Sequence, residues 1–113
     1  MTTPATIPAA EALLLADLIT PTDRGIASRV LLKNAGGNVT LFAFDAGEGL
    51  TEHTPSFDAL AFVLDGQLTL TIGGVVVSAA PGTVVRLPAA VPHAVDATKA
   101  SRMLLVMLKE PKA

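Results

Sequence analysis

Residues 60–77 read LAFVLDGQLTLTIGGVVV, and this stretch carries the clearest secondary-structure signal in the chain. At its centre, LTLTI alternates leucine or isoleucine with threonine, which is the period of two that a β-strand requires. The glycine pair that follows reverses the chain into a valine run, as expected of a β-hairpin. Asp65 and Gly66 predict another tight turn ahead of LTLTI. The stretch therefore predicts antiparallel β structure.

The same pattern continues in both directions from this stretch. Runs of Val, Leu, Ile, Thr and Phe are separated by Gly, Pro, Asn and Asp. These runs predict short strands at residues 26–33, 39–44, 60–64, 68–72, 75–77, 84–87, 93–95 and 103–108. A series of short strands at even spacing is typical of a sandwich or a jelly-roll barrel. Residues 25–110 are therefore assigned to an all-β barrel.

The first 24 residues differ in composition from the predicted barrel. Residues 1–8 contain two prolines and predict an extended arm. Residues 9–18 are rich in Ala and Leu and are followed by Pro21, so they predict a short N-terminal helix that packs on the sheet. A chain of 113 residues has the size of one domain, so residues 1–113 are assigned to a single domain.

Composition excludes several classes of partner. The formal net charge is −2, and the eight Lys and Arg residues are scattered along the chain, so no nucleic-acid partner is predicted. No apolar run approaches the ~20 residues that cross a bilayer, so no membrane partner is predicted. Residues 12–15 are apolar, but Glu11 and Asp17 flank them and no basic segment precedes them. We therefore expect a cytoplasmic protein, and the absence of cysteine excludes thiolate chemistry.

Two segments resemble the sequence motifs of the cupin family. Residues 47–66 resemble the first motif, G-x5-H-x-H-x3-E-x6-G, and residues 82–97 resemble the second, G-x5-P-x-G-x2-H-x3-N. The matching positions are Gly47, His53 and Gly66 in the first motif and Gly82, Pro88 and His93 in the second. The resemblance implies the cupin fold, a double-stranded β-helix that forms a jelly-roll barrel.

The resemblance also implies a metal site that this chain has only in part. In typical cupins, two histidines and the glutamate of the first motif, together with the histidine of the second, hold one divalent metal ion. Here Pro55 stands at the second histidine position and Ala59 at the glutamate position. Two of the four donors therefore remain, His53 and His93.

His53 and His93 are the only histidines of the chain, and both occupy motif positions that point into the barrel. Two interpretations stay open. The pair holds a divalent transition metal ion (Zn, Ni, Cu, Mn or Fe) with water completing the site, or the imidazoles bind each other, water or a small-molecule ligand. Glu52 should face away because strand neighbours alternate, and Asp58 is one residue from the lost glutamate position.

Three functions follow from these interpretations. The first is binding of a small molecule in the barrel interior, metal-free or with a weakly held metal. The second is a metal-dependent enzyme of the oxygenase or isomerase type, and the third is a structural or regulatory dimeric module. No catalytic residue can be assigned, because no Ser-His-Asp order, phosphate loop or carboxylate pair is present.

Two predicted strands are apolar on both faces. If Ala59 faces inward, then Leu60, Phe62 and Leu64 face out of the barrel, and residues 103–108 also carry apolar side chains on both sides. The predicted helix is too short to cover both outward rows. We therefore expect a homodimer in which a second copy covers the rest.

Overall fold

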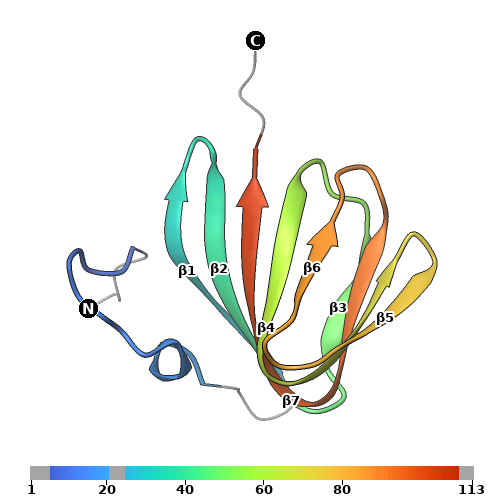
Figure 1. Ribbon diagram of the computed structural model, residues 1–113, viewed down its shortest axis with the longest axis horizontal. Coiled ribbons are helices and arrows are strands. Elements are labelled where there is room, and N and C mark those ends of the chain that lie inside the picture. Colours follow the sequence, from blue (N-terminus) through green and yellow to red (C-terminus); the bar gives the residue numbers. More distant parts are fainter. Residues whose placement is uncertain (1–5, 21–24, 110–113) are drawn as a thin grey trace.

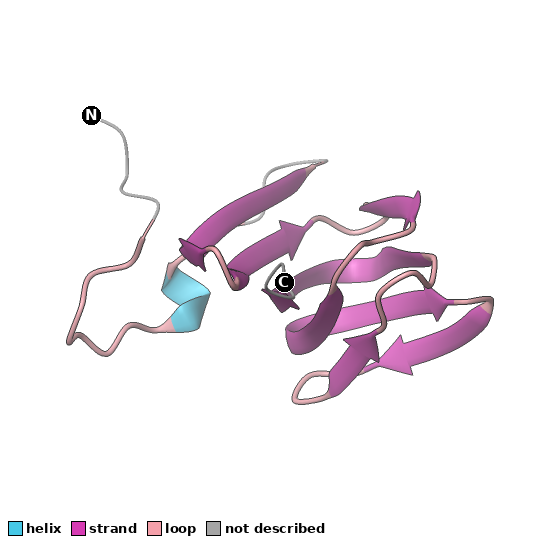
Figure 2. Ribbon diagram, turned by 90° about the horizontal axis from the view of Figure 1, so that it is seen from above, coloured by secondary structure: helices cyan, strands magenta, loops and turns pink. Residues whose placement is uncertain are grey.

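Seven strands make up the body of the computed structural model, which describes residues 6–20 and 25–109 (Figure 1). They are β1 (Ile26–Asn34), β2 (Gly37–Phe44), β3 (Gly49–His53), β4 (Asp58–Ile72), β5 (Val75–Ala79), β6 (Val84–Leu87) and β7 (His93–Leu108). All are antiparallel, in the order β1-β2-β7-β4-β5, with β3 on β7 and β6 on β4. Viewed from above, the strands curve around instead of lying in one plane (Figure 2). This arrangement confirms the all-β prediction.

The predicted turn at Asp65 and Gly66 is wrong, because β4 runs through both residues as one strand. Gly66 has a φ of +84°, and a Cβ at this position would collide with Ser101 and with the Ala100 carbonyl. The register with β7 shifts on both sides of the glycine. The sequence signal of a turn therefore marks a β-bulge, where glycine permits the backbone conformation and the close approach of the neighbouring strand.

β7 joins the two strands predicted at residues 93–95 and 103–108 into one. Its first half pairs with the second half of β4, and its second half pairs with the first half of β4. β6 pairs with the first half of β4, and β5 pairs with the second half. Because the two long strands bend at the bulge, their halves bring the shorter strands around a common interior.

The inward side chains of β4 and β7, with residues of β2, β5 and β6, form the main core. The predicted alternation is confirmed in β4, where Ala59, Ala61 and Val63 are buried. The other members of this cluster include Phe44, Leu68, Leu70, Ala79, Leu87, Val95, Ala97, Met103 and Leu105. Burial of apolar area of this kind contributes about 25 cal/mol per Å² to stability.

The predicted helix at residues 9–18 is wrong. Within residues 6–20 the only helical element is a 3-10 turn, η1 (Leu15–Asp17), and Ala10 has a left-handed φ of +61° that interrupts any helix. The segment is held to the sheet through its backbone: the Ile7 N–H donates to the Leu31 carbonyl. The side-chain guanidinium of Arg29, in β1, donates to the Leu18 carbonyl at 3.1 Å. Residues 1–5 of the predicted arm, Pro21 and residue 110 lie outside the described residues.

This N-terminal segment covers one part of the outer face of the sheet. Ile7, Leu18 and Ile19 pack with apolar residues of β1, β2, β4 and β7 in a second cluster. Leu60 and Phe62, on the same outer face, lie outside that cluster and are half-buried. On the neighbouring strands, Val84 is 52% exposed and Leu108 is 57% exposed. Of the described residues, no helix is long and apolar enough to cross a membrane.

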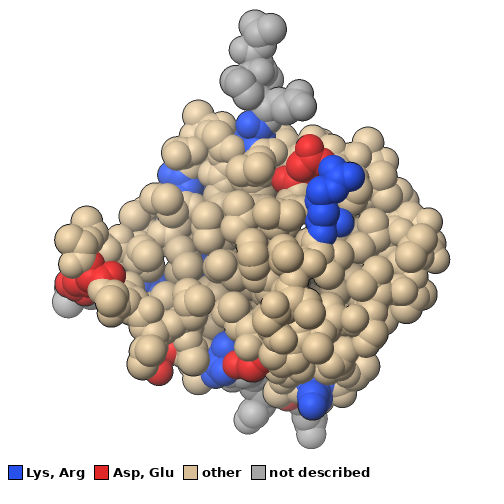
Figure 3. Space-filling view, in the orientation of Figure 1, with Lys and Arg blue, Asp and Glu red and all other residues tan. Residues whose placement is uncertain are grey.

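On the face shown in Figure 3, charged side chains are few, and in two places a basic group lies beside an acidic one. Lysine and arginine side chains gather in no basic patch there.

The homodimer stays a prediction, and the uncovered outer face gives its test. Phe62 lies in register with Leu104 and Val84 at the centre of this face. The protein should sediment as a homodimer at micromolar concentration, and Phe62→Asp should convert it to monomer, because the dimer would bury an unpaired carboxylate.

The matched control is Val76→Asp, which changes a 67% exposed valine of β5 in the hairpin that closes at Gly73 and Gly74. This variant should sediment as the native protein does, and both variants should keep the native circular dichroism spectrum. A native protein that sediments as monomer would contradict the dimer.

Candidate functional site

The structure brings His53 and His93 together at the entrance of the barrel. His53 ends β3 and His93 begins β7, and the two residues are partners in the antiparallel register. Their ring centroids lie 4.5 Å apart with the planes at 74°, an edge-to-face arrangement. The register of β3 is irregular between Leu50 and His53, which changes the side-chain alternation there. Both sequence-predicted histidines therefore share one site.

The two rings occupy different environments. His93 is only 6% exposed, and its Nδ1 is buried with no hydrogen-bond partner among the residues that the structure describes. His53 is exposed, and its Nδ1 lies 3.4 Å from the Thr51 carbonyl oxygen, to which it donates. Burial lowers the pKa of His93 below its ordinary value of 6.5, and the neighbouring His53 lowers it further. The buried ring is therefore neutral at pH 7, with one donor and one acceptor nitrogen.

A cavity of about 270 Å³ opens beside the two rings. Of the described residues that line it, only the two histidines are polar. The apolar lining residues are Phe42, Leu50, Pro55, Phe57, Ala59, Leu87, Val95, Met103, Leu105 and Met107. An apolar cavity with a few convergent polar groups is the usual form of a small-molecule site.

Pro55 and Ala59 line this cavity at the two positions where typical cupins have metal donors. Glu52 and Asp58 are exposed, and Asp58 instead accepts a hydrogen bond from the Ala89 N–H. Within residues 6–20 and 25–109, no group of three or more His, Cys, Asp or Glu side chains could hold a metal. Transition metals are usually held by roughly three or four protein donors. The side chains present do not fit such a set.

The segment before β4 and the loop between β6 and β7 flank cavity-lining residues, are called the rim here, and are joined by hydrogen bonds. The Ala90 N–H donates to the Pro55 carbonyl at 2.9 Å, next to the bond between Ala89 and Asp58. Ala90 has a left-handed φ of 64°, which is unfavourable for alanine, and it stands at the glycine position of the second motif. The bonds across the rim hold this strained backbone in place.

Sequence reasoning placed the histidines but missed most of the cavity wall. Phe57, to which no role in the site was assigned, lines the cavity, with the Lys109 ammonium 5.4 Å from its ring centroid. Met103 and Met107 were assigned only to an apolar row. The departures from the metal motif, Pro55 and Ala59, were the one sequence signal that the interior had become apolar.

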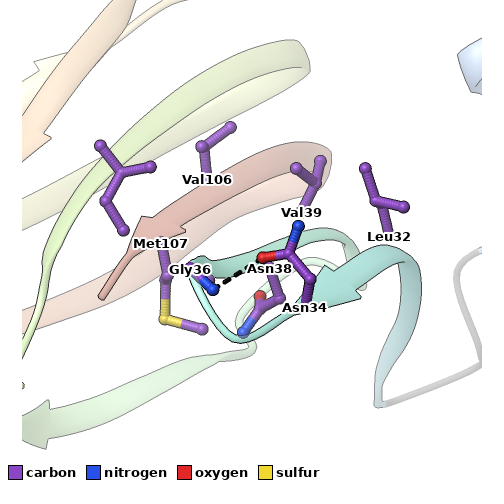
Figure 4. A pocket seen from close by; sticks show the side chains of 9 residues that line it. Leu32, Asn34, Gly36, Asn38, Val39, Val106 and Met107 are labelled. Carbon is purple, nitrogen blue, oxygen red and sulfur yellow. Dashed lines mark hydrogen bonds between the residues drawn. The ribbon is translucent and has the colours of Figure 1, made fainter. Parts of the chain in front are cut away.

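A second pocket lies outside the barrel, at the β1–β2 hairpin (Figure 4). It is lined by apolar residues of β1, β2 and β7 and by Asn34 and Asn38. Asn34 uses its side-chain oxygen to accept the Gly36 N–H at 2.7 Å, which closes the turn. None of the described lining residues titrates, so this pocket offers no acid, base or nucleophile.

Comparison with known proteins agrees with the geometry. The family model of the cupin domain matches residues 40–108. A solved structure of a conserved protein of unknown function from Streptococcus pyogenes is 31% identical, with a TM-score of 0.89, and the match covers 100% of this chain and 98% of that one. A cupin superfamily protein from Desulfitobacterium hafniense is 27% identical, with a TM-score of 0.87, covering 93% of this chain and 96% of that one.

A third solved structure is a longer protein. A cupin 2 conserved barrel domain protein from Leptotrichia buccalis is 33% identical, with a TM-score of 0.80, over 84% of this chain and 46% of that one. No curated protein matches the sequence. The matched family model spans most of the strands described above, including β3 with His53 and the start of β7 with His93. The chain belongs to the cupin family, and its barrel is the jelly roll, or double-stranded β-helix, of that family.

Proposed function

We propose that this cupin binds a small molecule inside its barrel, with His53 and His93 as the polar end of the site. The observation that carries the proposal is the apolar cavity of about 270 Å³ whose only polar lining residues, of those described, are His53 and the buried His93. A few convergent polar groups in an otherwise apolar wall are what orient a bound small molecule.

The rest of the cavity supplies affinity through apolar contact. Phe42, Phe57 and Leu105 are among the side chains that a bound molecule would cover. Each Å² of apolar area removed from water contributes about 25 cal/mol. His53 is exposed and His93 is buried, so the polar end of the site adjoins solvent on the His53 side.

A metal ion held by the same pair is a second candidate, favoured by the 4.5 Å separation of the two ring centroids. His53 and His93 would hold one Zn, Ni, Cu, Mn or Fe ion weakly, because imidazole suits these ions and two protein donors leave the remaining positions to water. Such an ion would add Lewis acidity beside the cavity. The oxygenase or isomerase alternative depends on this ion, whereas the small-molecule proposal does not.

Filling the cavity should abolish ligand binding. Ala59→Leu places a larger apolar side chain into the cavity at the position of the missing metal donor. Binding of small aromatic fragments, followed through the methyl signals of Met103 and Met107 by NMR, should weaken at least about tenfold. Ala46→Leu, at an exposed turn, is the matched control and should bind as the native protein does. Fragments that bind both variants equally would place the site elsewhere.

Metal binding has its own test by calorimetric titration with each ion. If the pair holds a metal, His53→Ala and His93→Ala should each abolish the binding signal, and affinity should fall below about pH 6.5, where protonated imidazole cannot donate a lone pair. Fragment binding that survives a chelator supports the metal-free site. Fragment binding that disappears with the chelator and returns with one ion supports the metal-dependent candidate.

Stability should depend on pH through His93. Because the folded-state pKa is lowered, the unfolded chain takes up a proton more readily than the folded chain as pH falls below 6.5. The contribution of neutral His93 is therefore complete above that value and is lost as pH falls toward the folded-state pKa. Urea unfolding at a series of pH values should show this decline, and His93→Gln should flatten it. A native protein that becomes more stable as pH falls through this range would contradict the neutral buried ring.

A further inference from the structure

We propose that the ligand is an uncharged hydroxyl compound, a phenol or an alcohol on an apolar body, with its hydroxyl at His93 and its body in the cavity. This inference rests on the proposed function and names the ligand class of that site. It follows from the size of the cavity, from the side chains that line it and from the hydrogen-bonding state of the two imidazoles.

The size of the cavity limits the ligand to a small compound. An apolar cavity of about 150 Å³ holds benzene. At the same volume per atom, this cavity of 270 Å³ holds a ligand of about eleven non-hydrogen atoms. This volume fits one substituted aromatic ring or a short branched chain, and it is too small to enclose a nucleotide or an oligosaccharide.

The charges around the cavity favour an uncharged ligand. None of the described lining residues is Lys, Arg, Asp or Glu, so a buried carboxylate or ammonium group would have no counter-charge. Lys109, whose ammonium lies 5.4 Å from the Phe57 ring centroid, is not among the lining residues. Glu52 and Asp58 are exposed. His53 is the charged or titratable neighbour that influences His93.

The hydrogen-bonding state of the imidazoles selects a hydroxyl. The Nδ1 of His53 lies 3.4 Å from the Thr51 carbonyl oxygen, an acceptor, which favours the tautomer whose other ring nitrogen is free to accept. The ring of His93 lines the same cavity, and a neutral imidazole carries one acceptor nitrogen. A ketone or an ether has no donor for these acceptors. A hydroxyl donates and accepts, so it pairs with His93 in either tautomer.

The test uses three probes with the same apolar body and different head groups: 4-ethylphenol, ethylbenzene and 4-ethylbenzoate. Affinities are measured at about pH 8 from the methyl signals of Met103 and Met107. The phenol should bind about tenfold more tightly than the hydrocarbon, and the benzoate should bind most weakly.

Substitution of the buried ring should remove the preference. His93→Leu should bind the phenol and the hydrocarbon equally, and Arg86→Gln, at an exposed position of β6, should behave as the native protein does. If His93→Leu does not fold, His53→Leu tests the same preference, and the difference in affinity between the phenol and the hydrocarbon should become smaller.

Each other outcome has a defined meaning. Tightest binding of the benzoate would overturn the uncharged class and leave the proposed binding function standing. Equal affinity of the native protein for phenol and hydrocarbon would overturn the hydroxyl. Failure of all three probes to shift the two methionine signals would overturn the hydroxyl class, and the proposed function falls only if the broader fragment set also fails.

Discussion

The antiparallel pairing of β4 with β7 is the interaction on which the rest of the structure depends. These are the two longest strands, and every other strand except β1 pairs with one of them. The pairing passes through a bulge at Gly66, where a side chain would collide with Ser101. The Ser101 hydroxyl accepts the Gln67 N–H at 2.9 Å and donates to the Lys99 carbonyl at 2.7 Å, so the irregular backbone remains hydrogen-bonded. Near this point the Asp65–Arg102 ion pair, 2.7 Å long, links the strands.

The site is a consequence of this pairing. β7 begins at His93 on one side of the bulge and contributes Met103 and Met107 to the cavity on the other side. β3 reaches the cavity only because it pairs with the first part of β7, which sets His53 opposite His93. A strand of ordinary length could not supply both the buried imidazole and the far wall. The polar end and the apolar body of the cavity are therefore held by one continuous strand.

The chemistry of the interior follows from which side chains replace the family's metal donors. Pro55 and Ala59 line the cavity at two positions where the family has metal ligands, so those two ligating groups are missing. The remaining imidazoles then meet a wall that is otherwise apolar, and burial lowers the pKa of His93. A neutral imidazole in such a wall is a hydrogen-bonding group of modest strength. Recognition of one polar head group on an apolar body is what this combination favours.

The sequence by itself determined the all-β class, most strand positions and the two histidines, because a period of two and the spacing of the motif residues are local properties that survive without a structure. Prediction from sequence was wrong where contacts with distant strands overrode the local sequence pattern. Asp65 and Gly66 have the composition of a turn, but the neighbouring strand makes them a bulge. Residues 9–18 have helix-forming composition, but hydrogen bonds and apolar contacts with the sheet hold the segment in another conformation. The cavity wall and the unpartnered Nδ1 of His93 were decided only by the tertiary structure, since both depend on contacts between strands that are far apart in the chain.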